Sequence, residues 1–317
     1  MKFQKVVVAG GGVLGSQIAM QTAFHGFDVT MWLRSEDSVG RTKPKMERLH
    51  QIYLDTLESL RDKCGSDSPM FPRGLVSSLK DLTPEKIDEL KAQATRAYEN
   101  VRYCTDLEEA VRDADLVIES VAEVPATKAA FYGNLAKVLP EKTIIATNSS
   151  TMLPSTFAEM TGRPDRYLAL HFANEVWRNN TAEIMGHPGT SPEAYEAVAE
   201  FAEQIFMVPL RLKKEQPGYI LNSLLVPFLN AAQALYAKDV ADPETIDKTW
   251  TLATGAPIGP FRILDIVGLN TAYNIVCMSP EIKDPDSLPS KIAAKLKEYI
   301  DAGKTGINAG EGFYNYK

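Results

Sequence analysis

One of the four histidines in the sequence, His171, stands where a proton-transferring base is expected. It follows the apolar run Tyr167-Leu168-Ala169-Leu170, which predicts a buried strand that ends near the histidine. An imidazole has an unperturbed pKa of about 6.5, so at neutral pH it can take a proton from an alcohol. Glu183 comes twelve residues later, and a carboxylate behind the imidazole would fix its tautomer and stabilise the imidazolium. We therefore predict that His171 and Glu183 form a pair for general base catalysis.

Polar residues that could hold a substrate oxygen lie close to this histidine in the predicted sheet. Asn148-Ser149-Ser150 closes the neighbouring predicted strand, residues 143–147, and Asn174 follows His171 by three positions. A serine hydroxyl and an asparagine amide can bind the substrate oxygen while a hydride leaves the same carbon, and this chemistry needs no metal. The other histidines are better explained by a helix end, a polar helix and a turn: His25, His50 and His187.

A glycine-rich turn near the N-terminus predicts a partner for that hydride. Val6-Val7-Val8-Ala9 leads into Gly10-Gly11-Gly12-Val13-Leu14-Gly15, after which a helix is expected. In such a motif the first glycine allows a tight turn, the second lets the backbone approach a pyrophosphate, and the third lets the helix pack on the strand. Because the motif follows a buried strand and opens a helix, we predict a dinucleotide site that includes Gly10, Gly12, Val13, Leu14 and Gly15.

The end of the second predicted strand bears on which dinucleotide is bound. An acid is expected there to hold the adenosine ribose, but the sequence reads Trp32-Leu33-Arg34-Ser35. Arg34 and Ser35 suit a 2′-phosphate, and a charge-assisted contact of this kind contributes roughly 1.5–3 kcal/mol. Alternatively, Arg34 is solvated or stacks on the adenine, and Glu36 or Asp37 binds the ribose. We favour NADP(H) over NAD(H).

The spacing of apolar residues predicts the elements that position these groups. Segments with helical spacing, such as residues 13–24 and 127–138, separate strand-length apolar runs at residues 6–9, 29–33, 116–120, 143–147, 167–172 and 207–212. This alternation predicts an α/β, Rossmann-type, doubly wound sheet. Two long polar helices around a Gly/Ser/Pro-rich break at residues 65–73 predict a helical hairpin inserted at about residues 36–100.

No strand is predicted after Lys213, where a linker leads into helical sequence. We therefore expect a dinucleotide-binding domain at residues 1–213 and an all-α substrate and dimerisation domain at residues 214–317. The net charge of −7, with no long block of like charge, gives no reason to expect a nucleic-acid partner. The three cysteines lie too far apart to form a zinc site or a disulfide framework, which favours a reducing compartment: Cys64, Cys104 and Cys277.

Nothing in the sequence predicts a membrane or a targeting segment. The longest apolar stretches, such as residues 219–229, are interrupted by Asn222 and Pro227, so we expect no membrane span. The first predicted strand begins almost at the first residue, so we expect no leader peptide and a cytoplasmic location.

At these motifs the sequence resembles the 3-hydroxyacyl-CoA dehydrogenase family. The resemblance covers nearly the whole chain except roughly residues 65–84. It rests on Gly10 to Gly15, Glu119-Ser120-Val121-Ala122-Glu123 with Lys128, Asn148-Ser149-Ser150, His171-Phe172-Ala173-Asn174 to Glu183, Gly218-Tyr219-Ile220-Leu221-Asn222 to Pro227, Gly255 to Phe261, and Gly312-Phe313-Tyr314.

The resemblance implies a role for each of these polar residues. It makes His171 the general base and Glu183 its partner. It places Ser150 and Asn222 on the substrate oxygen. The residues that it places around the nicotinamide and its ribose are Glu123, Lys128, Asn148 and Asn174. It also implies a helical C-terminal domain that carries a homodimer contact.

The sequence departs from this family in two places that bear on specificity. Relatives usually carry Asn-Pro and further prolines after the histidine, whereas here residues 174–180 read Asn-Glu-Val-Trp-Arg-Asn-Asn. That stretch resembles bacterial diketoreductase-like members, which reduce 3,5-dioxo esters without CoA. Most relatives also carry an acid where Leu33 stands, so the resemblance implies NAD while Arg34 favours NADP(H). An insertion separates Lys304 from the last motif, so no cofactor role is assigned to it.

The sequence therefore predicts reversible oxidation of an L-3-hydroxyacyl-CoA, or a related 3-hydroxy ester, to the 3-oxo compound by hydride transfer. One alternative is the dehydrogenation of a free 3-hydroxy or sugar acid, as in gulonate dehydrogenases, with Arg178 on the carboxylate. The other is a non-catalytic dinucleotide-binding protein, like the lens crystallins that share this fold. A purely structural protein would have no need for all four catalytic candidates.

Overall fold

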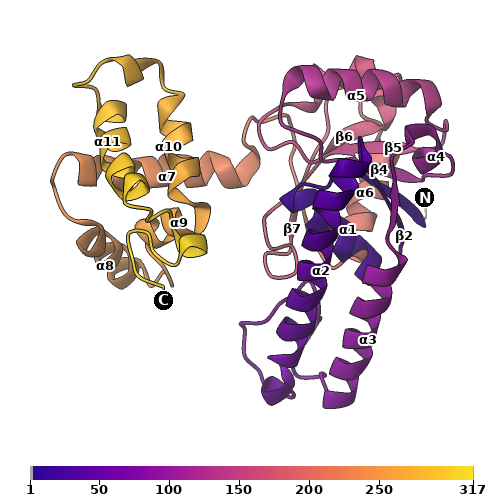
Figure 1. Cartoon of the computed structure of the whole chain (residues 1–317), viewed down its shortest axis with the longest axis horizontal. Coiled ribbons are helices and arrows are strands. Elements are labelled where there is room, and N and C mark those ends of the chain that lie inside the picture. The colour runs from indigo at the N-terminus through magenta and orange to yellow at the C-terminus, as the bar shows by residue number, and fades with distance from the viewer. Residues whose placement is uncertain (1–2, 317) are drawn as a thin grey trace. The chain divides into compact units, whose positions relative to one another are not determined.

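The computed structural model describes residues 3–316, and the chain forms two compact units (Figure 1). The first unit ends at Ile220 and the second begins at Leu221. The sequence pattern alone had placed the domain boundary between residues 213 and 214.

The first unit is built on a sheet whose strands, in the described residues, run in the order β3-β2-β1-β4-β5-β6-β7-β8. Every neighbouring pair is parallel except β6 with β7, which is antiparallel. Six of the eight strands coincide with predicted apolar runs that begin and end within one residue of them, and the two others, β3 and β7, were not predicted. The strands are β1 (Lys5–Ala9), β2 (Asp28–Trp32), β3 (Arg102–Cys104), β4 (Leu116–Glu119), β5 (Ile144–Thr147), β6 (Tyr167–Phe172), β7 (Thr181–Met185) and β8 (Val208–Arg211).

Helices cover both faces of this sheet, which confirms the doubly wound class. Val6 and Val8 of β1 pack in one buried cluster with residues of α1, α2, α3 and α6. Val7 of the same strand packs in a second cluster with residues of α5 on the opposite face. The helices are α1 (Val13–Phe24), α2 (Glu36–Glu58), α3 (Pro84–Asn100), α4 (Leu107–Val111), α5 (Pro125–Val138) and α6 (Pro192–Gln204), with short 3-10 turns at Arg61–Lys63, Pro154–Thr156, Ala158–Thr161 and Pro164–Arg166.

The predicted helical hairpin is present and consists of α2 and α3. The two helices run side by side away from the sheet (Figure 1). The side chains of Ser35 and Thr83 cap them by accepting hydrogen bonds from backbone amides one turn later. Gly74, in the connection between the helices, lies so close to the chain after β6 that a Cβ atom would approach the Val176 carbonyl to 2.7 Å. The hairpin is therefore packed against the loop that follows His171.

The second unit is helical, as the sequence predicts. Its core gathers apolar side chains around Phe261 and Leu264, and two buried carboxylates tie its loops together. Asp247 accepts a hydrogen bond from the backbone amide of Phe261 at the start of α9, and Asp265 accepts one from the backbone amide of Phe313. The helices are α7 (Tyr219–Ala237), α8 (Pro243–Thr254), α9 (Pro260–Val267), α10 (Leu269–Cys277) and α11 (Leu288–Asp301), with 3-10 turns at Pro280–Lys283 and Ile307–Ala309.

By length and composition alone, α7 is apolar enough to cross a membrane, although Asn222 and Pro227 lie within it. This differs from the expectation that these two residues would rule out a span. A core helix of a soluble protein meets the same criterion, so the finding by itself does not identify a membrane segment.

Candidate active site

His171 and Glu183 are brought together by the antiparallel pairing of β6 with β7. The register places the two residues directly opposite each other, so both side chains lie on the same face of the sheet. His171 Nδ1 lies 3.0 Å from Glu183 Oε2, and the residues are only 5% and 3% exposed. A carboxylate can only accept, so a neutral imidazole that bonds it carries its proton on Nδ1 and its lone pair on Nε2. The pair thus has the geometry that proton abstraction requires.

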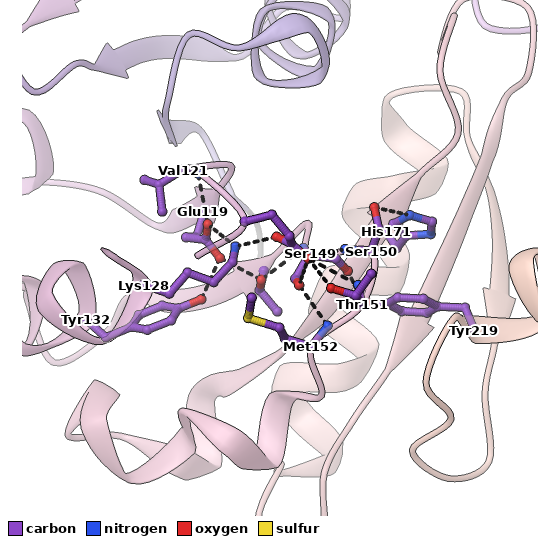
Figure 2. A network of polar contacts seen from close by, with 12 residues as sticks. Glu119, Val121, Lys128, Tyr132, Ser149, Ser150, Thr151, Met152, His171 and Tyr219 are labelled. Carbon is purple, nitrogen blue, oxygen red and sulfur yellow. Dashed lines mark hydrogen bonds and ion pairs between the residues drawn. The ribbon is translucent and has the colours of Figure 1, made fainter. Parts of the chain in front are cut away.

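Ser150 completes the polar group around the imidazole. Its Oγ lies 3.2 Å from His171 Nε2 (Figure 2). Ser150 follows β5, the parallel neighbour of β6, and the carboxyl ends of parallel strands meet at one edge of a sheet. Asn222 stands in the first turn of α7, in the second unit, and its part in the site stays a prediction.

The carboxylate of Glu123 holds the turn that carries Ser150. Its Oε1 accepts hydrogen bonds from the Ser149 hydroxyl, from the amides of Ser150 and Thr151, and from the Thr151 hydroxyl. Burial opposes ionisation, but these bonds and the Lys128 ammonium outweigh it and hold the pKa of Glu123 below its usual value. Glu123 is therefore ionised at neutral pH and positions the serine turn.

Lys128 is buried in an ion-pair network behind this turn. Its Nζ lies 2.7 Å from Glu119 Oε1 and 3.1 Å from Glu123 Oε2, and the lysine side chain is 1% exposed. Glu119 also accepts hydrogen bonds from the hydroxyls of Tyr132 and Thr147. Because the ammonium is enclosed by two carboxylates, we infer that any effect of Lys128 on cofactor binding passes through Glu123.

The two asparagines predicted near the nicotinamide lie in different surroundings. Asn148 is buried, and its Oδ1 accepts the backbone amide of Phe172, which links the ends of β5 and β6. Asn174 is exposed in the loop after β6. The next residue, Glu175, has a left-handed backbone (φ 59°), and its amide donates to Gln17 of α1. The loop that carries Asn174 is thus tied to the helix that follows the glycine turn.

The glycine turn has the geometry that a pyrophosphate requires. A Cβ atom on Gly10 would lie 2.2 Å from the Ser120 carbonyl, and one on Gly15 would lie 2.3 Å from the Gly10 carbonyl. Both positions therefore demand glycine so that β1, β4 and α1 can approach. At Gly12 a Cβ would meet no described atom within 4 Å, so the backbone there is open to a ligand at the N-terminus of α1. Val13 is exposed at the start of α1, and Leu14 is partly buried against the core.

A cavity of about 570 Å³ lies beside this turn and is suited to the adenosine half of a dinucleotide. The turn, the end of β2, α2 and α5 all line it. Three of its lining residues are basic and, among the described residues that line it, none is acidic. The basic residues are Arg34, Arg41 and Lys45.

The residues after Arg34 are arranged differently from the sequence prediction. Ser35 does not line the cavity, and its hydroxyl caps α2 by accepting the Ser38 amide. Ser38, one turn further, lines the cavity and was not predicted. Glu36, an alternative ligand for the ribose, accepts a hydrogen bond from Thr105 instead and lines another pocket. Asp37 is not among the cavity residues either.

The other histidines have structural surroundings. Burial, partly offset by the Gly74 carbonyl, lowers the pKa of His25 to about 4, so this residue is neutral at pH 7. His50 contacts Thr95 and stacks on Tyr98 of the helical hairpin. Within residues 3–316, no group of three or more His, Cys, Asp or Glu side chains is placed to hold a metal ion, and the three cysteines are free thiols.

Family models match almost the entire chain. The model described as "3-hydroxyacyl-CoA dehydrogenase, NAD binding domain" matches residues 5–63 and 73–216. The model described as "3-hydroxyacyl-CoA dehydrogenase, C-terminal domain" matches residues 218–316. The unmatched stretch between the first two segments lies in the connection between α2 and α3.

Individual proteins and solved structures agree with these matches. The mitochondrial hydroxyacyl-coenzyme A dehydrogenase of Homo sapiens is 31% identical over 98% of this chain and 91% of its own. A solved structure of a diketoreductase, described as catalysing reactions of dicarbonyl compounds, is 49% identical with a TM-score of 0.84 over all of both chains. The (S)-3-hydroxybutyryl-CoA dehydrogenase of Ralstonia eutropha is 25% identical with a TM-score of 0.72, again over all of both chains. The chain belongs to the 3-hydroxyacyl-CoA dehydrogenase family, whose members are oxidoreductases that act on CH–OH groups with a nicotinamide dinucleotide.

Proposed function

We propose that this enzyme interconverts an L-3-hydroxyacyl compound, as a CoA thioester or a related ester, with its 3-oxo form, using His171 as the general base. The observation that carries the proposal is the position of the imidazole between Glu183 and Ser150, at 3.0 Å and 3.2 Å. A buried histidine with a carboxylate on Nδ1 and a hydroxyl on Nε2 is arranged to exchange a proton with an alcohol oxygen.

In the oxidation direction, the substrate hydroxyl gives its proton to His171 Nε2 while the Ser150 hydroxyl holds the same oxygen. Asn222 is proposed as a second donor to this oxygen. Glu183 stabilises the imidazolium as it forms, because its charge faces the ring at Nδ1. The nicotinamide, when bound, supplies the hydride acceptor. In the reverse direction the imidazolium returns the proton to the carbonyl oxygen.

Initial rates test the substrate class. Acetoacetyl-CoA and a 3-oxo ester are each assayed with NADH and with NADPH, and gulonate is assayed with NAD⁺ and with NADP⁺. The 49% identity to a diketoreductase supports the 3-oxo ester as a substrate beside the thioester. We expect turnover of the two 3-oxo compounds and negligible turnover of gulonate. Turnover of gulonate alone would move the enzyme to the free-acid class, and cofactor binding without any turnover would favour a non-catalytic role.

We further propose that the enzyme prefers NADPH to NADH. Three cations and no carboxylate among the described residues line the cavity beside the glycine turn. A 2′-phosphate carries nearly two negative charges, so NADPH would gain charge-assisted contacts with these cations. NADH would gain no comparable bonds from its ribose hydroxyls, because Leu33 stands where an acid would accept them.

Replacing Arg34 by alanine should lower kcat/KM for NADPH by about 10-fold and leave kcat/KM for NADH nearly unchanged. Only NADPH, which carries the 2′-phosphate, loses a charge-assisted contact in this variant. The matched control is Lys43→Ala on the neighbouring helix, because Lys43 lies over the Tyr103 ring and does not line the cavity. A wild-type preference for NADH, unchanged in the Arg34 variant, would contradict the proposal.

Replacing Glu183 by glutamine should slow alcohol oxidation by about 10-fold or more, since a neutral amide stabilises the imidazolium less than a carboxylate does. In the oxidation direction the rate rises with pH as the imidazolium loses its proton. A less stable imidazolium loses its proton at lower pH, so the acidic limb of the pH–rate profile should move to lower pH. Glu175→Gln, an exposed acid in the loop after β6, serves as the control. An unmoved limb with an unchanged rate would make Glu183 structural.

We also propose that the enzyme is a homodimer whose contact lies in the second unit. That unit exposes large apolar side chains, and apolar surface of this kind usually marks an interface. Leu224, Leu252 and Met278 are 68%, 76% and 81% exposed. Light scattering at micromolar concentration should give about twice the chain mass of 34.9 kDa, and a stable monomer at that concentration would contradict the proposal.

A further inference from the structure

The aromatic ring of Tyr219 lies against one face of the His171 imidazole. The two ring centroids are 4.4 Å apart and the planes are inclined by only 13°, which is a stacked arrangement (Figure 2). Tyr219 is buried in a small apolar cluster with Ala169 of β6 and Met185 of β7. The imidazole plane is therefore fixed by contact with a ring that is itself fixed by packing.

The hydroxyl of the same tyrosine reaches the serine turn. It donates a hydrogen bond of 2.7 Å to the Ser149 carbonyl, the group directly before the Ser150 amide. Burial raises the pKa of Tyr219 far above its usual range, so the hydroxyl stays a donor and takes no part as an acid or base at neutral pH. Together with Glu123, it holds the Ser149–Ser150 peptide in place.

The backbone at this position is held in a conformation that a residue with a side chain rarely adopts. Gly218 and Tyr219 have φ angles of 78° and 56°, both in the left-handed region. The next amide, that of Ile220, donates a hydrogen bond of 2.8 Å to Glu183 Oε1. One short segment thus places a ring on the base, a hydroxyl on the serine turn and an amide on the supporting carboxylate.

We propose that Tyr219 is a positioning residue for proton transfer: its ring orients the His171 imidazole and favours its protonated form, and its hydroxyl orients Ser150. A cation over an aromatic face is attracted by the ring, and the imidazolium would form within that range. The proposal rests on the proposed role of His171 as the base. The other titratable groups whose charge or hydroxyl acts on Tyr219 come from β7, the β4–α5 loop, β4 and β6: Glu183, Glu123, Glu119 and Tyr167.

Two variants separate the contributions of the ring and the hydroxyl. Tyr219→Leu removes the aromatic face together with the hydroxyl, so beyond any loss in Tyr219→Phe its kcat for alcohol oxidation should fall about 3- to 10-fold and the acidic limb should move about 0.5–1 pH unit lower. Tyr219→Phe keeps the face but frees the Ser149 carbonyl. It should lower kcat/KM about 3- to 10-fold with the limb unmoved. Tyr53→Phe, a buried tyrosine whose hydroxyl bonds Gln21 in another part of the unit, is the control and should change neither quantity.

A second readout needs no substrate. With four histidines in the chain, the ring nitrogens of His171 can be assigned in the ¹⁵N spectrum of histidine-labelled protein by comparison with His171→Gln. We expect a single tautomer with Nδ1 protonated in the wild type and in Tyr219→Phe, and exchange-averaged or broadened ring signals in Tyr219→Leu. If the leucine variant does not fold, Tyr219→Met fills a similar volume without an aromatic face.

The outcomes distinguish the two proposals. Wild-type turnover together with an unmoved limb and unchanged ring signals in the leucine or methionine variant would overturn the role of the ring, and wild-type kcat/KM in Tyr219→Phe would overturn that of the hydroxyl. An equal loss in both variants, with the limb and the ring signals unmoved, would assign the whole effect to the hydroxyl and overturn the role of the ring. If the ring signals change as expected but the wild type turns over no carbonyl compound, the proposed function fails while the positioning contact stands.

Discussion

Replacing His171 by glutamine should lower kcat by about 10²–10⁴-fold, the range that general acid–base catalysis contributes. Glutamine fills much of the same space and can still bond Glu183, but it cannot take a proton from the substrate hydroxyl. The glycine turn and the cavity beside it lie on other residues, so cofactor affinity should not change. The measurements are steady-state kcat with the 3-oxo substrate and the fluorescence titration of NADPH.

The control for this prediction is His50→Gln, because His50 lies on the helical hairpin, where it contacts Thr95 and stacks on Tyr98. It should leave kcat and cofactor affinity unchanged. A His171 variant with near-normal kcat would remove this residue from the mechanism. A variant that instead loses NADPH binding would mean that the base also supports the cofactor site.

The parallel part of the sheet could be predicted because its strands are buried on both faces. Such strands consist of uninterrupted apolar residues, as in Val6 to Ala9, and these stand out from the amphipathic helices between them. The two strands that were not predicted lack this signal. β3 has only three residues and starts with an exposed arginine. β7 contains Thr181 and Glu183, which interrupt any apolar run.

Strand β7, which the sequence pattern did not predict, also explains why part of the site could not be predicted. Glu183 was paired with His171 because of its residue type and the family resemblance, since a spacing of twelve residues does not by itself bring two side chains together. The physical reason for their contact is the antiparallel register that sets them opposite each other, and this register follows from the unpredicted strand. Tyr219 belongs to a motif that carried the resemblance, but its stacking on His171 depends on a left-handed backbone that the sequence did not indicate.

The cofactor residues on α2 show a limit of another kind. Two cations of this helix, Arg41 and Lys45, line the cavity beside Arg34. Which hydroxyl lies there depends on where the helix begins. Ser35 became the N-cap, so the next serine on the same face, Ser38, lines the cavity. The expected start of the helix near residue 36 agrees with α2, but the sequence did not show that the helix itself would use the Ser35 hydroxyl as its cap.

The ion pair of Glu119 with Lys128 gives rise to a prediction about stability. Both side chains are almost completely buried, at 0% and 1% exposure. Removing two charges from water costs several kcal/mol each, and the pair is stable here because Tyr132 and Thr147 also bond the carboxylate. The arrangement therefore depends on both partners, and the loss of one should cost more than the loss of both.

Replacing Lys128 by methionine should lower the free energy of unfolding by about 3–5 kcal/mol, because it leaves the Glu119 carboxylate buried without a cation. The double variant Glu119→Gln/Lys128→Met removes the stranded charge, so it should be more stable than the single variant, as measured by urea unfolding followed by circular dichroism. Lys86→Met is the control, since Lys86 forms an exposed ion pair with Glu89 that contributes little. A single variant as stable as the wild type, or a double variant less stable than the single one, would show that the buried charges do not depend on each other.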